Sequence, residues 1–321
     1  MIFCLASFAQ QRSTTTTYPY NGLLINPAYA GSLNLLSVIA VHRKQWINVE
    51  GAPSLTAFSA HSSFASNRVG IGLFASKASQ SITDDYSLYG SYAYKINTPI
   101  GILAMGLQGG FNQRTSDYEK LNLLSTDPLM QGAPTRFSPN FGTGIYLANP
   151  VYYIGASVPY LLENIILENS ELTNSDNQSI EKRHYYLSGG FIYPINDHLK
   201  ISPGFLLKGQ EAIPLSWNAN INLIIDEVAY LGINYRNTGD FGILGQVMLN
   251  ENLRVGYAYD VNTSQINTVS SGSHEIFINY RIKLKNYRKD SNVLSNFNPQ
   301  RLMLLQSNLG IPLFNGGCQS F

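Results

Sequence analysis

The pattern that most constrains the fold of this chain is an alternation of apolar and polar residues, repeated along stretches of about ten residues. In residues 252–262, one face carries Leu253, Val255, Tyr257 and Tyr259, and small or charged residues lie between them. Side chains two positions apart lie on the same face of a β-strand. Each stretch therefore has one apolar and one polar face, and the period of an amphipathic helix is absent throughout. An all-β fold is expected.

Fourteen such stretches occur along the chain. They are residues 33–45, 54–64, 68–78, 85–96, 99–112, 140–149, 151–158, 183–194, 198–207, 212–224, 227–236, 240–250, 252–262 and 273–284. The connections alternate between tight ones, such as Asn97-Thr98, and longer ones, such as 79–84, 113–139 and 159–182. Bacterial barrels have an even number of strands, with short periplasmic turns and longer extracellular loops at opposite ends. The pattern predicts a transmembrane antiparallel up-and-down β-barrel of about 14 strands, with both chain ends in the periplasm. Each of the two longest loops is expected to hold a short helix or a lid.

Composition excludes several other classes of protein. Only 13% of residues are charged and the net charge is +1, whereas soluble domains carry about 25% charged residues. A nucleic-acid-binding protein needs a basic excess, and a disordered chain has few aromatic residues, but this chain has 21 Tyr. Its apolar runs are too short for a transmembrane helix of about 20 residues. A secreted β-sandwich is the alternative all-β fold, but Lys and Glu usually furnish the polar face of a sandwich. Here Gly, Ser, Asn and Tyr occupy it, which favours the barrel.

The ends of the chain predict the domain organisation. Residues 1–9 are typical of the end of a signal peptide, because small Ser7 and Ala9 stand at the −3 and −1 positions before Gln10. A basic start is missing from this segment, so the expected signal peptide is truncated; the alternative is a buried N-terminal strand. The expected organisation continues with a periplasmic segment at 10–32, the barrel at 33–285 and a periplasmic tail at 286–321. Such a protein belongs in the cell outer membrane.

Residues that carry chemistry are sparse. The five histidines form no HExxH motif or other metal-ligand spacing, and Cys4 and Cys318 form no CxxC motif. No pair of nucleophile and base can be assembled from the sequence, so no enzymatic activity, no metal and no cofactor is expected. The glycine-rich stretch Gly106 to Gly110 precedes no helix, which excludes a phosphate loop. Its glycines are expected to relieve crowding on a curved strand.

Four short motifs stand out, and they carry a resemblance to a known family. They are NPAYAGS at 26–32, RKQW at 43–46, GAPSLT at 51–56 and GSHEI at 272–276, the last preceded by Tyr259-Asp260. In this order they resemble the PorP/SprF family of Bacteroidota outer-membrane proteins. The resemblance implies a barrel associated with the type IX secretion system. It also implies partners among secreted adhesins, a link to gliding motility, and a periplasmic or peptidoglycan-anchored partner. The tail beyond Lys285 departs from the family, whose members usually stop soon after the last strand.

The motifs allow two interpretations. The structural one assigns a turn to Asn26-Pro27, an unusual backbone conformation to Gly31, and an interfacial aromatic position to Trp46. Arg43 and Gln45 would then be polar residues of the inner wall. The functional one makes these residues a docking surface at the periplasmic mouth, together with the basic tail. Its candidates are Asn26, Pro27, Tyr29, Gly31, Arg43, Gln45, Trp46, Arg288 and Lys289.

The expected function is that of an accessory or cargo-docking component of type IX secretion. The alternative is a passive porin or small-solute channel. The two differ in whether the lumen is open.

Overall fold

The computed structural model describes residues 15–33, 35–120, 132–167, 179–211, 213–263 and 268–283. Its strands are β1 (Leu36–Lys44), β2 (Ser54–Phe64), β3 (Val69–Gln80), β4 (Thr83–Thr98), β5 (Gly101–Ser116), β6 (Thr135–Ala148), β7 (Tyr152–Val158), β8 (Asn164–Leu167), β9 (Ser179–Glu181), β10 (His184–Phe191), β11 (Tyr193–Pro194), β12 (Leu199–Gln210), β13 (Ile213–Ile225), β14 (Ala229–Arg236), β15 (Asp240–Met248), β16 (Leu253–Asn262) and β17 (Ser273–Ile282).

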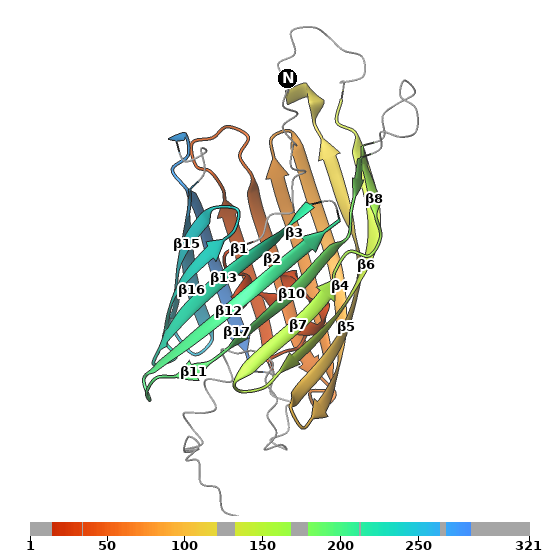
Figure 1. Cartoon of the computed structure of the whole chain (residues 1–321). Helices are drawn as coiled ribbons and strands as arrows, with labels where there is room; N and C mark the ends of the chain where they lie inside the picture. Colours follow the sequence, from red (N-terminus) through yellow and green to blue (C-terminus); the bar gives the residue numbers. More distant parts are fainter. Residues whose placement is uncertain are drawn as a thin grey trace, which may run out of the picture.

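All of these strands except β8 and β9 form one closed antiparallel barrel (Figure 1). Each strand pairs with its neighbours in sequence, and β1 pairs with β17 to close the ring. β10 pairs with β7 and β12, and β11 continues it after a break at Ile192. With β10 and β11 counted together, the ring has fourteen strands. β8 and β9 form a separate hairpin. The predicted strand number and up-and-down order are confirmed.

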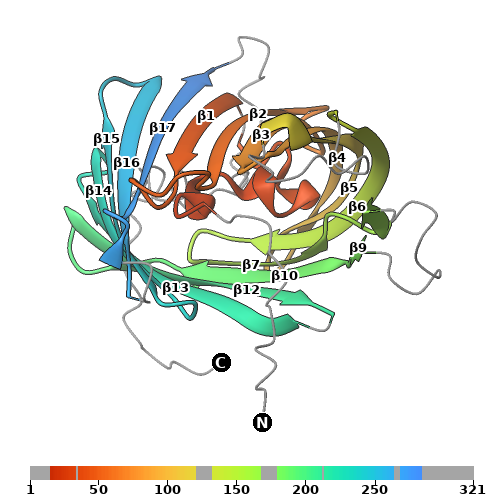
Figure 2. The same ribbon diagram turned by 90° about the horizontal axis from the view of Figure 1, so that it is seen from above.

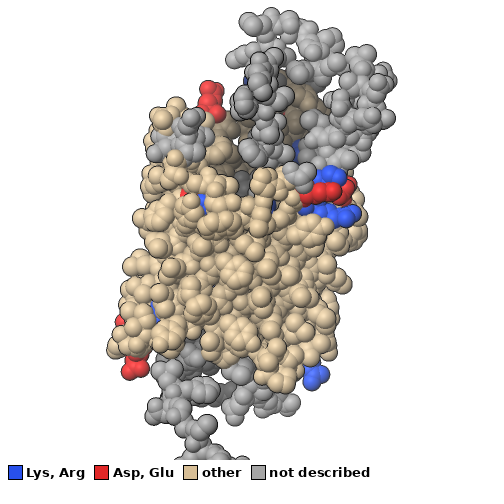
Figure 3. Space-filling model, viewed as in Figure 1, with Lys and Arg blue, Asp and Glu red and all other residues tan. Residues whose placement is uncertain are grey.

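The period-2 pattern translates into an apolar outside and a polar inside. Tyr257 and Ile278 are exposed on the outer wall, whereas Asn218 and Asp260 are buried on the inner wall. Figure 3 shows a broad belt free of Lys, Arg, Asp and Glu around the middle of the visible face, with charged side chains towards the two ends. This distribution matches a barrel whose outer belt faces lipid. Within the described residues, no helix is both long and apolar enough to cross a membrane.

The connections are described in part, and one of them differs from expectation. The loop expected at 79–84 is a two-residue turn, Ser81-Ile82, because β3 and β4 pair as far as Gln80 and Thr83. Ser81 makes this turn with a positive φ of 51°. In the 159–182 loop, where a short helix or a lid was expected, the described part contains the β8–β9 hairpin. The 113–139 loop contains a single 3-10 turn, η4 (Tyr118–Lys120), in its described part.

Connections define two ends of the barrel. The loop end carries the connections β1–β2, β3–β4, β5–β6, β7–β10, β12–β13, β14–β15 and β16–β17, and the turn end carries the others. Residues before β1 do not extend from the turn end. They form three 3-10 turns, η1 (Tyr18–Tyr20), η2 (Gly22–Leu24) and η3 (Pro27–Tyr29), and Figure 2 shows these turns inside the ring.

The candidate functional site inside the barrel

Residues 15–33, called the lumen segment here, fill part of the barrel interior. Thr16 lies near the loop end, where it contacts Asp260 and Glu275, and Leu33 lies at the turn end, where its carbonyl accepts a hydrogen bond from Ser63. Nearly every residue between them is buried. The sequence-based expectation of a periplasmic segment at 10–32 is therefore corrected for its described part: this part lies inside the barrel, not below its mouth.

A buried ionic cluster holds the start of the lumen segment. Arg43 Nη1 lies 2.6 Å from Asp260 Oδ2 and 2.9 Å from Glu275 Oε2. The Thr16 amide donates to Glu275 Oε2 (2.9 Å), and its hydroxyl donates to Asp260 Oδ2 (2.7 Å). The Thr17 amide donates to Glu275 Oε1 (3.1 Å), and its hydroxyl bonds the same oxygen. The lumen segment therefore supplies four donors to two carboxylates of the wall.

The electrostatics of this cluster explain why the lumen segment and the barrel wall stabilise each other. One guanidinium faces two carboxylates, and all three side chains are at most 3% exposed. Buried charges are costly unless they are paired and fully hydrogen-bonded. Arg43 compensates one negative charge, and the donors of Thr16 and Thr17 strengthen the network through charge-assisted bonds. Without the lumen segment, the two carboxylates would lose these donors.

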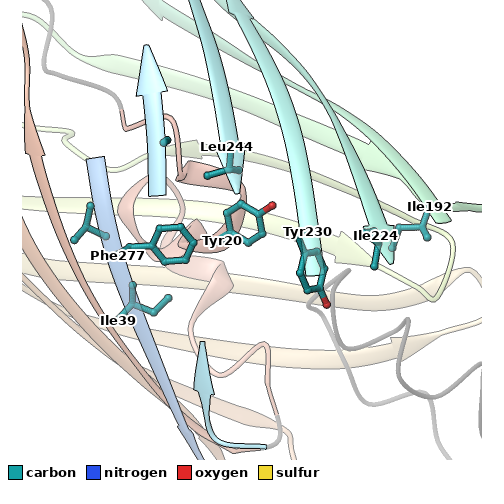
Figure 4. Packing of buried hydrophobic residues seen from close by; sticks show 9 residues of the cluster. Tyr20, Ile39, Ile192, Ile224, Tyr230, Leu244 and Phe277 are labelled. Atoms are coloured by element: carbon teal, nitrogen blue, oxygen red, sulfur yellow. The ribbon is translucent and has the colours of Figure 1, made fainter. Parts of the chain in front are cut away.

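Tyrosines fix the middle of the lumen segment. The Tyr20 ring stacks on Phe277, with ring centroids 5.5 Å apart, and meets Tyr230 edge-on at 6.3 Å. Figure 4 shows these rings packed with Leu244 and Ile39 inside the barrel. The Tyr20 hydroxyl donates to Asn222 Oδ1 (3.2 Å). Asn222, on the inner face of β13, thus binds the lumen segment.

The NPAYAG motif forms the third turn of the segment. Asn26 caps η3, because its Oδ1 accepts from the Ala28 amide at 2.9 Å. Its Nδ2 donates to the carbonyl of Ile145 in β6 at 2.9 Å. Pro27 stands at the first position of the turn, where its missing N–H costs nothing. Gly31 has a φ of 63°, which favours glycine. The local contacts of Asn26, Pro27 and Gly31 are therefore those of a capped turn followed by a glycine with a positive φ.

Glycines on the inner wall make room for this turn. A Cβ at Gly106 would collide with the backbone of Ala28, and one at Gly70 would collide with the Ala30 carbonyl. A Cβ at Gly144 would overlap the Asn26 amide group. Crowding at Gly106 therefore comes from the lumen segment, not from strand curvature as the sequence suggested. The inner wall and the segment are built to fit each other.

Further polar contacts tie the segment to strands around the ring. Ser59 of β2 donates to Asn21 Oδ1 (2.9 Å), and Ser157 of β7 donates to the Ile25 carbonyl (2.6 Å). Lys95 of β4 donates to the Gly31 carbonyl and to Asn67 Oδ1. Asn220 of β13 donates to the Tyr18 hydroxyl at 2.5 Å. Because these strands lie on different sides of the ring, the segment crosses the lumen rather than lining one wall.

The predicted docking residues that the structure describes lie in two places. Asn26, Pro27, Tyr29, Gly31 and Arg43 lie inside the barrel. Arg288 and Lys289 lie outside the described residues. The five interior residues are buried and expose no side-chain surface at the turn-end mouth. They therefore do not form the single docking surface that was expected at that mouth.

Gln45 and Trp46 lie at the rim of the loop end, where both are partly exposed. The Trp46 amide donates to Ser273 Oγ at 3.2 Å, and the Ile47 amide donates to the Gly272 carbonyl at 2.9 Å. The RKQW and GSHEI motifs therefore meet at this rim, and each also sends one charged residue, Arg43 or Glu275, into the cluster below it.

Sequence reasoning did not single out Thr16, Thr17, Asp260 and Glu275 as site residues. A signal was present: Asp260 and Glu275 both occupy inward positions of neighbouring strands, where carboxylates require cationic or donor partners. The many apolar residues of the lumen segment were a second signal, since a solvated periplasmic stretch would not need them.

No cluster of His, Cys, Asp and Glu suited to a metal ion occurs in the described part of the chain. A small pocket lies between the segment and the wall, lined mainly by Tyr18, Ile25, Tyr29, Tyr146 and Tyr153. Its lining is mainly aromatic and also includes Asn26 and Ser188.

The geometry defines the protein as an outer-membrane β-barrel whose lumen holds part of its own N-terminal region. The chain is similar to solved structures of outer-membrane barrels. The CymD monoaromatic hydrocarbon channel is 11% identical, with a TM-score of 0.50, and the match covers 83% of this chain and 93% of that one. Omp33 of Acinetobacter baumannii is 9% identical, with a TM-score of 0.45, and the match covers 79% and 100%. No curated protein matches the chain.

The family is shown by a match over residues 7–280 to the type IX secretion system membrane protein PorP/SprF family. The chain belongs to this family, as the four motifs predicted. It is thus an outer-membrane protein of type IX secretion.

Proposed function

We propose that this barrel is an accessory or cargo-docking component of type IX secretion, linked to export of surface adhesins and to gliding motility. Its partners would be a periplasmic or peptidoglycan-anchored protein, a secreted adhesin, or both. It would need no cofactor and catalyse no reaction.

The occupied lumen is the observation that carries this proposal. A diffusion porin needs a continuous water-filled path. Here Thr16, Tyr20 and Ala28 are bound to different sides of the wall, and all three are buried. A barrel whose lumen is partly filled by its own chain is better suited to holding a partner protein at the membrane than to passing solutes.

Docking is proposed at the turn end, through the basic tail. β17 ends at Ile282 at the turn end, and the chain continues from there towards Arg288 and Lys289. The strand connections at this end are short, so they offer little other surface. Arginine is enriched in protein interfaces, and cationic groups steer anionic partners.

A pull-down from native outer membranes tests the docking role. The double variant Arg288→Glu with Lys289→Glu should lose a partner that the wild type retains, and surface display of the cargo should fall. Arg301→Glu, with a single charge reversal farther along the same tail, is the control and should retain the partner. An unchanged partner set in the double variant would contradict docking through the tail.

Conductance in planar bilayers tests the porin alternative. The wild-type barrel should show no steady open channel, since the lumen segment obstructs it. A stable, large conductance from the wild type would favour the porin.

A further inference from the structure

Three hydrogen-bond donors without a partner lie together at the turn end of the lumen. They are the Tyr230 hydroxyl on β14, the Gln246 amide nitrogen on β15 and Arg254 Nε on β16, each deeply buried and without a hydrogen bond. The side chains are 1%, 5% and 2% exposed. Buried donors are normally satisfied, so this concentration on three adjacent strands needs an explanation.

The strand register brings the three groups together. Tyr230 pairs directly with Gln246 across β14 and β15. Gln246 pairs with Gly256, two positions from Arg254 on the same face of β16. All three occupy inward positions. Figure 4 shows the Tyr230 hydroxyl pointing away from Leu244 and from the Tyr20 ring. Diagonal neighbours on one face of a sheet lie within reach of long side chains, so the donors can converge on one ligand.

Charge at this site is predominantly positive. Arg281 on β17 lies next to Arg254, since Arg254 pairs with Asn279 and Arg281 donates to Asn279 Oδ1 at 2.7 Å. The nearby carboxylate, Glu227, binds Lys200 at 2.8 Å. Among the described residues, Arg254 has no carboxylate within ion-pair distance; its Nη2 contacts Met248 Sδ at 3.4 Å. A buried guanidinium without a counter-charge is strongly unfavourable.

We propose that these residues bind a phosphate-type oxyanion at the turn end of the lumen. Such an anion offers several acceptor oxygens, which match a guanidinium, a phenolic hydroxyl and an amide nitrogen at once. Arginine is the residue best suited to bind phosphate in this way. The chain's own tail is a poor occupant, because residues 283–321 carry Lys283, Lys285, Arg288, Lys289 and Arg301 but only Asp290 as an acidic side chain.

The site is independent of the docking proposal, since it depends on the barrel wall and not on the tail. The anion could be free phosphate or a phosphate ester at the end of a larger molecule. Both share the chemistry that the donors recognise, and the two ligands used below separate them.

Isothermal titration of the full-length barrel in detergent, with inorganic phosphate and with glycerol phosphate, tests the proposal. The wild type should bind at least one of them saturably; tighter binding of glycerol phosphate would indicate an ester, and tighter binding of inorganic phosphate a free anion. Arg254→Gln should weaken binding by about tenfold or more, because it removes a charge-assisted contact. Tyr230→Phe should weaken it less and leave the barrel folded, as judged by its heat-dependent gel mobility.

Arg236→Gln is the matched control. Arg236 is also a buried inward arginine of β14, but it lies at the loop end, where it pairs with Asp240 at 2.9 Å. This variant should bind phosphate like the wild type. Absence of saturable binding in the wild type would mean that water satisfies the three donors, and it would overturn the proposal. Equal binding by the wild type, Arg254→Gln and Tyr230→Phe would do the same.

Discussion

Arg43 and Glu275 are direct neighbours across the seam where the first and last strands of the barrel meet. They pair in register between β1 and β17, and their side chains form a 2.9 Å ion pair inside the lumen. Glu275 also accepts the backbone amides of Thr16 and Thr17. One ion pair therefore joins barrel closure to retention of the lumen segment.

The first prediction concerns this pair. Arg43→Met should lower the free energy of unfolding by about 3–5 kcal/mol, because it leaves Asp260 and Glu275 as uncompensated buried charges. Urea unfolding of the refolded barrel, followed by gel mobility, measures the change. Arg114→Met is the control: Arg114 pairs with Asp85 in a partly exposed setting, where an ion pair contributes about 1 kcal/mol or less. Similar losses in both variants would show that the Arg43 cluster is not specially stabilising.

A second prediction concerns the lipid-facing wall. Tyr257→Arg or Ile278→Arg should each cost about 2–4 kcal/mol, since both side chains are exposed on the outer belt. Asn262→Arg on the inner face should be mild, because Asn262 already donates to Asp240 Oδ1 at 2.7 Å and an arginine can replace that contact. Equal damage from outward and inward substitutions in the same unfolding assay would refute the assigned faces.

Asn279 is not a suitable inward control, although the alternation alone suggests it. It lies between Arg254 and Arg281 and bonds Ser37 Oγ at 3.0 Å. An arginine there would add a third cation to a buried basic group. The face of a residue follows from the local period, but its neighbours follow from the register of the whole ring.

The wall of the barrel was predictable because each strand carries its own pattern. Residues 54–64 coincide with β2, and 252–262 differ from β16 by a single residue. The lumen segment was not predictable in this way. It has no period, and contacts such as Thr16 with Asp260 join residues 244 positions apart. The inward glycines Gly70 and Gly106 leave room for the lumen segment. The absence of a side chain in the sequence does not show what fills that room.

The orientation of the barrel is the third prediction. The short connections of the turn end should face the periplasm and the loop end the outside of the cell. In a variant without native cysteines, Glu50→Cys at the loop end should react with an impermeant maleimide on intact cells. Asn97→Cys at the turn end should react only after permeabilisation; both positions are exposed in the structure. If Asn97→Cys alone were labelled on intact cells, the turn end would face the outside of the cell and the predicted orientation would be wrong.

The last prediction tests whether the lumen segment can be displaced without destroying the barrel. Gly106→Val places a side chain where the backbone of Ala28 now lies. The third turn of the segment, η3, must therefore move away from β5. Fourteen paired strands remain, and the barrel should still insert and run as a folded species. In the background without native cysteines, Ala28→Cys should be unreactive towards a small thiol reagent when Gly106 is present, because Ala28 is 1% exposed.

The same cysteine should become reactive when combined with Gly106→Val, and the barrel should then conduct ions in planar bilayers. Gly245→Val is the control, because Gly245 of β15 has only ordinary contact with Leu231 at 3.9 Å and no contact with the segment. Conductance that rises in the Gly106 variant alone would mean that the segment is what obstructs the lumen. If the channel stays closed while the cysteine reacts, the barrel is blocked elsewhere, and the segment's role is to hold the wall together rather than to close it.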